Sequence, residues 1–97
     1  MKKIKLMADY QCYPLWGTTP EDFGDIPPES LPISLSLKIS LEEWAERYNK
    51  TMNIDDPASS GFKNEEDEKL FINDGHKLAE RLQVELGNTY KIIYHSV

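Results

Sequence analysis

The fold of this chain is decided by one stretch, Asn64-Glu-Glu-Asp-Glu-Lys-Leu-Phe-Ile-Asn-Asp-Gly-His-Lys-Leu-Ala-Glu-Arg-Leu-Gln-Val-Glu-Leu-Gly87. Asn64 is a favoured N-cap residue, and the four acidic residues after it complement the positive end of the helix dipole. Gly87 is typical of the position just past a helix end. The stretch therefore predicts a helix over residues 64–86, with a buried stripe formed by Leu70, Phe71, Leu78, Leu82 and Leu86.

The segment before it fits two templates. Alternating apolar residues indicate a strand (Leu31, Ile33, Leu35, Leu37, Ile39 and Leu41), whereas a helical stripe runs through Leu37, Leu41, Trp44, Ala45, Tyr48 and Met52. Ser34 and the capping box that starts at Ser40 are competing helix starts. The longer stripe favours a helix over residues 34–52 with Trp44 in the core. The alternative is a strand over residues 31–39 and a helix that starts at Leu41.

Both ends of the chain alternate between apolar and polar residues. Residues 2–10 and 89–96 are therefore predicted strands. Residues 11–31 contain four prolines and two glycines, and we interpret them as a loop held over the core by its own apolar side chains. Residues 53–62 are a second loop. The expected fold is α+β: one two-layer domain over residues 1–97, ordered strand, long loop, helix, helix, strand, with an antiparallel sheet of two or three strands packed on the two helices.

Composition restricts the function. The chain has 11 basic and 17 acidic residues and a net charge of −6, which argues against direct binding to nucleic acid. Its one cysteine, Cys12, cannot form an intramolecular disulfide. The apolar run near the amino terminus is too short for a signal peptide, and no stretch is long enough to span a membrane. We therefore expect a cytoplasmic protein with no membrane partner.

Catalytic and metal sites are weakly supported. Cys12 could act as a nucleophile with His76 or His95, but nothing local supplies a base and an orienting group, so a small hydrolase is a minor alternative. Metal binding would draw on Asp9, Asp55, Asp56 and His76, whose spacing matches neither a calcium loop nor a zinc site. We expect no enzyme activity, no metal and no cofactor.

The negative charge is concentrated in two blocks. Residues 9–29 and residues 54–68 each carry a net charge of −5, while the rest of the chain sums to +4. Recognition surfaces are often built on loops, so these blocks are candidates for docking onto a basic partner, although a merely solvated acidic surface is the alternative. The candidate partner-binding residues are Trp16, Glu21, Asp22, Asp25, Asp55, Asp56, Phe62, Glu65 and Glu66.

Several stretches resemble a widespread family of small bacterial proteins. They are Leu6-Met-Ala-Asp-Tyr-Gln-Cys-Tyr-Pro-Leu-Trp16, Leu31-Pro-Ile-Ser34, Trp44-Ala-Glu-Arg-Tyr48, Asp55-Asp-Pro-Ala-Ser-Ser-Gly-Phe62, Gly75 and Leu78-Ala-Glu-Arg-Leu82. Some members resemble immunity proteins of contact-dependent growth inhibition and related polymorphic toxin systems. The resemblance implies a protein that binds and neutralises a cognate toxin domain, often a nuclease, and it implies no catalytic residues. The alternative is a regulatory or interaction domain that is not linked to a toxin, with homodimerisation through a sheet edge as one form.

Overall fold

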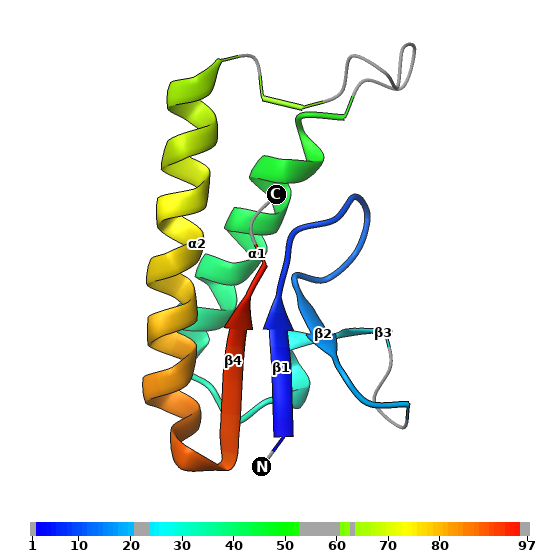
Figure 1. The fold of residues 1–97 in the computed structure, drawn as a ribbon, viewed down its shortest axis with the longest axis vertical. Helices are drawn as coiled ribbons and strands as arrows, with labels where there is room; N and C mark the ends of the chain where they lie inside the picture. The colour runs from blue at the N-terminus through cyan, green and yellow to red at the C-terminus, as the bar shows by residue number, and fades with distance from the viewer. Residues whose placement is uncertain (1, 21–23, 53–60, 63, 96–97) are drawn as a thin grey trace.

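The computed structural model describes residues 2–20, 24–52, 61, 62 and 64–95. Two helices pack on one face of a four-stranded sheet whose strand order is β3-β2-β1-β4 (Figure 1). The strands are β1 (Lys2–Leu6), β2 (Leu15–Gly17), β3 (Gly24–Ile26) and β4 (Tyr90–Tyr94). The helices are α1 (Leu35–Asn49) and α2 (Glu65–Leu86), and short 3-10 turns lie at Pro28–Ser30 (η1) and Gly87–Thr89 (η3).

The predicted α+β class is confirmed, but the predicted sheet is wrong in two respects. β1 and β4 pair in parallel, not antiparallel, and the sheet has four strands. The two extra strands, β2 and β3, lie in the segment predicted as a loop. The parallel pairing has a separate cause: β3 runs in the same direction as β1, and residues 27–34 then carry the chain back to the end of the sheet where β1 begins, before α1 starts (Figure 1). The two antiparallel helices return the chain to that same end, so β4 runs in the same direction as β1.

Helix α1 resolves the ambiguity in favour of the helical template. Leu37 and Leu41 are fully buried, while Leu35 and Ile39, which a strand would place on the same side as these two, are 71% and 46% exposed. The Ser34 hydroxyl accepts a hydrogen bond from the Leu37 amide at 3.1 Å and so caps the helix. The helix ends at Asn49, three residues before the predicted end.

The end of α2 also supports the start of α1. The Glu85 carboxylate accepts hydrogen bonds from the Ser34 amide at 2.6 Å and from the Ser34 hydroxyl at 2.9 Å. A negative charge at a helix N-terminus is stabilising because it complements the helix dipole. This contact fixes the end of one helix against the beginning of the other.

The prediction for α2 is confirmed at its caps and in most of its stripe. The Asn64 side chain accepts a hydrogen bond from the Asp67 amide, and Gly87 occupies the C-cap with φ of 66°. Phe71, Leu78, Leu82 and Leu86 are buried, but Leu70 is 57% exposed, so its place in the stripe was predicted wrongly. Gly75 takes up the remaining buried position of the stripe.

Gly75 allows the sheet and both helices to approach one another closely. A Cβ atom at this position would overlap the Tyr94 hydroxyl and would lie 2.6 Å from Tyr94 Cζ and 2.8 Å from Trp44 Cζ2. The Trp44 ring stacks on Phe71 with centroids 4.4 Å apart, and its Nε1–H donates to the Phe71 carbonyl. Trp44 is only 2% exposed, which confirms its predicted place in the core.

The outer edge of β4 is partly closed by a side chain. The Gln83 amide group donates to the Tyr90 carbonyl at 2.8 Å and accepts from the Ile92 amide at 3.0 Å. It thereby satisfies backbone groups that a neighbouring strand would otherwise bind. Because unpaired edge groups invite pairing with another chain, Gln83 limits strand addition along this part of β4.

Candidate functional site

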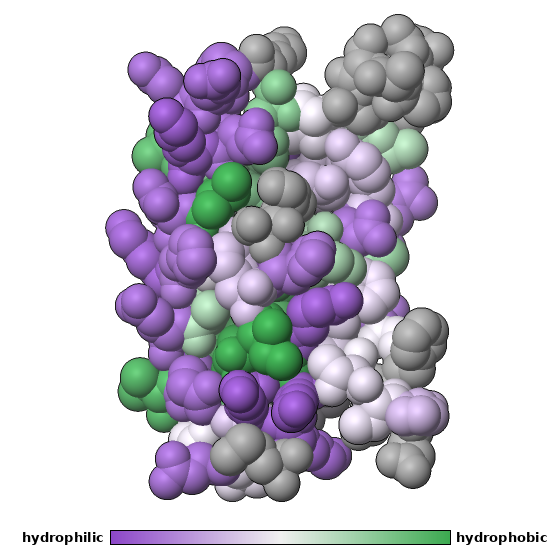
Figure 2. Space-filling view, in the orientation of Figure 1, coloured by the Kyte–Doolittle hydropathy of each residue, from purple (hydrophilic) through white to green (hydrophobic). Residues whose placement is uncertain are grey.

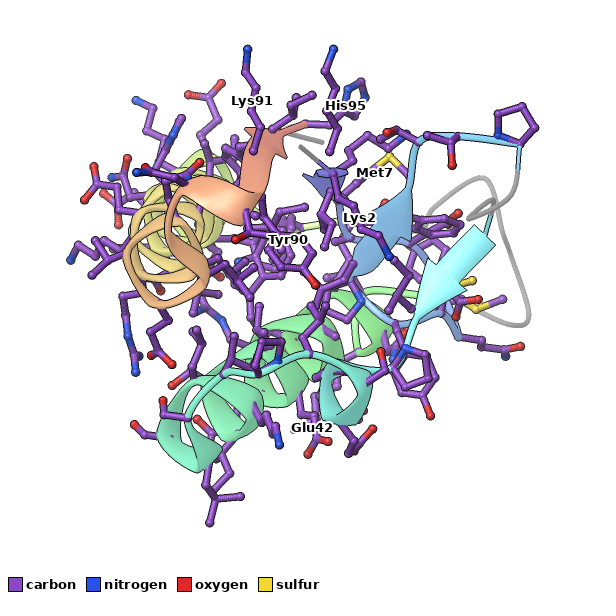
Figure 3. The ribbon with its side chains drawn as sticks, turned by 90° about the horizontal axis from the view of Figure 1, so that it is seen from below. Lys2, Met7, Glu42, Tyr90, Lys91 and His95 are labelled. Atoms are coloured by element: carbon purple, nitrogen blue, oxygen red, sulfur yellow. The ribbon has the colours of Figure 1, made fainter. Side chains whose placement is uncertain are left out.

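A groove with acidic walls lies between the β1–β2 connection and α1. It has a volume of about 440 Å³ and is lined by Gln11, Cys12, Tyr13, Pro14, Asp25, Glu42, Ala45, Glu46 and Asn49. We call this the acidic groove. Three of these residues carry carboxylates and none is basic. Figure 3 shows Glu42 projecting from α1 on the side away from the sheet.

The β1–β2 connection is held in place by the C-terminal half of α1. Gln11 has a left-handed backbone with φ of 60°, and its amide donates to Asn49 Oδ1 at 2.9 Å. The Tyr10 ring stacks on Tyr48 with centroids 4.6 Å apart, and its hydroxyl lies 2.9 Å from Thr51 Oγ1. These contacts present one wall of the acidic groove in a fixed conformation, which lowers the entropic cost of binding.

Asp25 forms the other side of the acidic groove. Its Oδ2 accepts a hydrogen bond from the Tyr13 amide at 2.9 Å, so the carboxylate is oriented by the wall that it faces. Tyr13 itself is 44% exposed at the rim. An exposed tyrosine beside fixed carboxylates is suited to contacts with basic side chains, through both hydrogen bonds and the ring face.

The thiol of Cys12 lies close to the negative charges of the acidic groove. Burial raises its pKa, and the negative charges of Asp25 and Asp9 raise it further. A reactive cysteine needs the opposite, a pKa lowered by nearby positive charge. His76, one of the histidines considered as a base, instead packs edge-on against Tyr94 on another part of the molecule. The geometry therefore gives no support to Cys12 as a nucleophile.

The other predicted binding residues are placed in different ways. Trp16 is half-buried on β2, and its Nε1–H donates to the Met7 carbonyl at 2.9 Å. Phe62 packs beside the core with its ring centroid 5.0 Å from that of Phe71, so it is anchored to the protein's own aromatic cluster. Glu21, Asp22, Asp55 and Asp56 lie outside the described residues.

Glu65 and Glu66 are exposed on the first turn of α2, and no described hydrogen bond or ion pair connects them to the acidic groove. Of the predicted acids that the structure describes, it therefore places only Asp25 in the groove. Two further carboxylates, Glu42 and Glu46, were missed because residues 30–53 have no net charge. Their spacing of four residues places them on the same face of α1, and this signal could have identified them.

The described residues contain no group of three His, Cys, Asp or Glu side chains arranged to hold a metal ion. Neither described helix is both long enough and apolar enough to cross a membrane. What the geometry offers is a preformed, negatively charged surface suited to binding.

Comparison with known families assigns the chain to a class of immunity proteins. The model of the Serratia CdiI immunity protein-like family matches residues 2–97, so the chain belongs to this family. No curated protein matches the chain. The resemblance stated from the sequence motifs is thereby confirmed at the level of the family.

Proposed function

We propose that this protein is a cytoplasmic immunity protein that binds a cognate toxin domain and blocks its active site or substrate groove with an acidic surface. The acidic groove is the observation that carries the proposal: Asp25, Glu42 and Glu46 surround a cavity with no basic lining residue. A toxin that acts on nucleic acid needs a basic surface to hold phosphates. An acidic inhibitor would occupy that surface, and a nuclease is therefore the proposed target.

The proposal extends to the other acidic segments. Glu65 and Glu66 would add to the negative field from α2, together with Glu21, Asp22, Asp55 and Asp56 in the two loops. Trp16 and Phe62 are the proposed aromatic contacts. Complementary charge accelerates diffusional encounter, which is useful to an inhibitor that must capture a toxin before the toxin reaches its substrate.

The test is a binding measurement with the toxin domain encoded next to this gene. The double variant Glu42→Gln/Glu46→Gln removes two carboxylates from the acidic groove. We expect its affinity to fall by about tenfold or more, mainly through slower association, and the salt dependence of binding to weaken. The matched control, Glu43→Gln/Glu80→Gln, removes two exposed carboxylates that do not line the acidic groove and should leave binding nearly unchanged.

Equal affinity of the two double variants would contradict a role for the acidic groove. Failure of the native protein to bind the toxin domain, or to protect cells that produce it, would contradict the proposed immunity function as a whole.

A further inference from the structure

On its β1 and β4 half, the face of the sheet opposite the helices has a charge of the opposite sign to the acidic groove. The parallel pairing of β1 with β4 places Lys3 beside Lys91 and Lys5 beside Ile93. Met7 and His95 follow the same register beyond the strand ends, since the His95 amide donates to the Leu6 carbonyl. We call the surface formed by Lys3, Lys5, Met7, Lys91, Ile93 and His95 the basic sheet face.

Neither of the described helices, α1 and α2, covers the basic sheet face. In Figure 3, Lys91 and His95 point away from both helices. The buried residues of β1, Ile4 and Leu6, alternate with the lysines and face the core on the other side. Figure 2 looks onto the sheet and shows a hydrophobic patch bordered by hydrophilic side chains. Ile93 is 39% exposed on this surface. The basic sheet face is thus an accessible surface with both positive and apolar character.

The arrangement of the lysines is unfavourable in the isolated protein. Lys3 and Lys91 are direct register partners, and like charges placed opposite each other across neighbouring strands repel. Neither ammonium group forms an ion pair with a carboxylate of the described residues. A negatively charged ligand on this surface would offset the repulsion. It would therefore bind more tightly to this pair of lysines than to two surface lysines that are far apart.

We propose that the basic sheet face docks an acidic, amphipathic segment of a partner protein. The lysines supply charge complementarity, and Ile93 with Met7 supplies an apolar centre that a protein side chain can bury. An extended polyanion such as nucleic acid fits less well, because it would also approach the carboxylates elsewhere on this acidic chain. A symmetric dimer through this surface would place the lysine rows of two copies against each other. This docking differs from that at the acidic groove in its elements and charge: the lysines are on β1 and β4, whereas Asp25 lies two strands away on β3, and Glu42 and Glu46 lie on α1.

The test uses two probes on the isotopically labelled full chain, followed by NMR. The first probe is a short synthetic helical peptide with glutamates along one side and leucines along the other. The second is a thymidine oligonucleotide of the same net charge. We expect the peptide to shift the amide signals of Lys3, Lys5, Lys91 and Ile93, with an affinity that falls as salt is added. We expect the oligonucleotide to shift them far less.

A matched pair of variants completes the test. Lys3→Gln/Lys91→Gln should weaken peptide binding by about tenfold, whereas Lys69→Gln/Lys77→Gln, which removes two exposed lysines of α2, should not. The first variant should also unfold at a higher urea concentration than the native chain, because the repulsion is gone; this shows that lost binding is not lost folding.

Any of four results would overturn the proposal. The peptide could leave these amides unshifted, the oligonucleotide could shift them as strongly as the peptide, or the Lys3/Lys91 variant could bind the peptide as well as the native chain. The fourth is a shift of the same amides when the concentration of the native chain alone is raised, which would assign the surface to a second copy.

Discussion

Packing around Gly75 determines whether Gly75→Ala raises or lowers the stability of the protein. At an ordinary exposed helix position, replacing glycine by alanine stabilises a protein by about 1 kcal/mol, because alanine has the higher helix propensity. Here the added Cβ would lie 2.6 Å from Tyr94 Cζ and 2.8 Å from Trp44 Cζ2. Favourable carbon contacts lie near 3.5–4.0 Å, so both rings would have to move by about 1 Å.

Neither ring can move without losing a contact. The Trp44 Nε1–H is bonded to the Phe71 carbonyl at 2.9 Å, and the Tyr94 hydroxyl donates to the Ile72 carbonyl at 3.2 Å. Overpacking costs about 1–3 kcal/mol, and a lost hydrogen bond about 0.5–1.5 kcal/mol. After subtraction of the helix-propensity gain, we expect Gly75→Ala to lower the free energy of unfolding by about 2 kcal/mol, or about 10 °C in melting temperature.

Urea unfolding followed by circular dichroism measures this change, with Asn73→Ala as the control at an exposed position of α2. The control should be neutral or slightly stabilising. In a Tyr94→Leu background the cost of Gly75→Ala should shrink, because the nearest atoms are gone. An unchanged or higher urea midpoint for Gly75→Ala alone would refute the reasoning, and an equal cost in both backgrounds would exclude Tyr94 as the obstructing residue.

Three further predictions follow from local contacts. Gln83→Ala should lower the free energy of unfolding by about 1–3 kcal/mol in thermal or urea denaturation, because it leaves the Ile92 amide without its partner, and it should increase self-association at high concentration in sedimentation. Burial raises the pKa of Tyr94, so the stability from this neutral phenol is present below about pH 10 and is lost as the pH rises through the raised pKa; Tyr94→Phe should lose less stability in alkaline urea titrations. Asp25→Asn should lower the pKa of Cys12 and speed its alkylation by iodoacetamide at mildly alkaline pH, measured by mass spectrometry; an unchanged rate would mean that the carboxylate does not act on the thiol.

The elements that could be predicted from the sequence are those with local signals. Helix α2 has a capping residue, an acidic first turn and a terminal glycine, so its ends were found to within a residue. β2 and β3 have three residues each, which is too short for an alternating pattern; pairing with β1 holds β2 in place, and pairing with β2 holds β3. The direction of β4 depends on the end of the sheet at which α1 starts, and that end is set by the path of residues 27–34 after β3.

The carboxylates of the candidate site also differ in whether the sequence could predict them. Asp25 could be found because its segment carries only negative charge, whereas Glu42 and Glu46 lie among lysines and an arginine that cancel them in a count along the chain. The acidic groove arises because the β1–β2 connection contacts both β3, through Tyr13 and Asp25, and α1, through Gln11 and Asn49. The basic sheet face depends equally on the parallel register of β1 and β4, which brings together lysines 88 residues apart.

The pairing of β1 with β4 also has a consequence for biosynthesis. Because Lys2 pairs with Tyr90, the sheet cannot be completed until the segment that contains residues 90–94 has left the ribosome. Contacts of such sequence separation slow folding, since the entropy of closing a long loop is lost before the contact forms. Until then Ile4 and Leu6, both buried in the folded protein, lack their neighbours on β4, which are Ile92 and Tyr94. A protein built this way completes its sheet only after residues 90–94 have been synthesised, so a fresh supply of folded protein lags behind transcription by the time of both translation and folding.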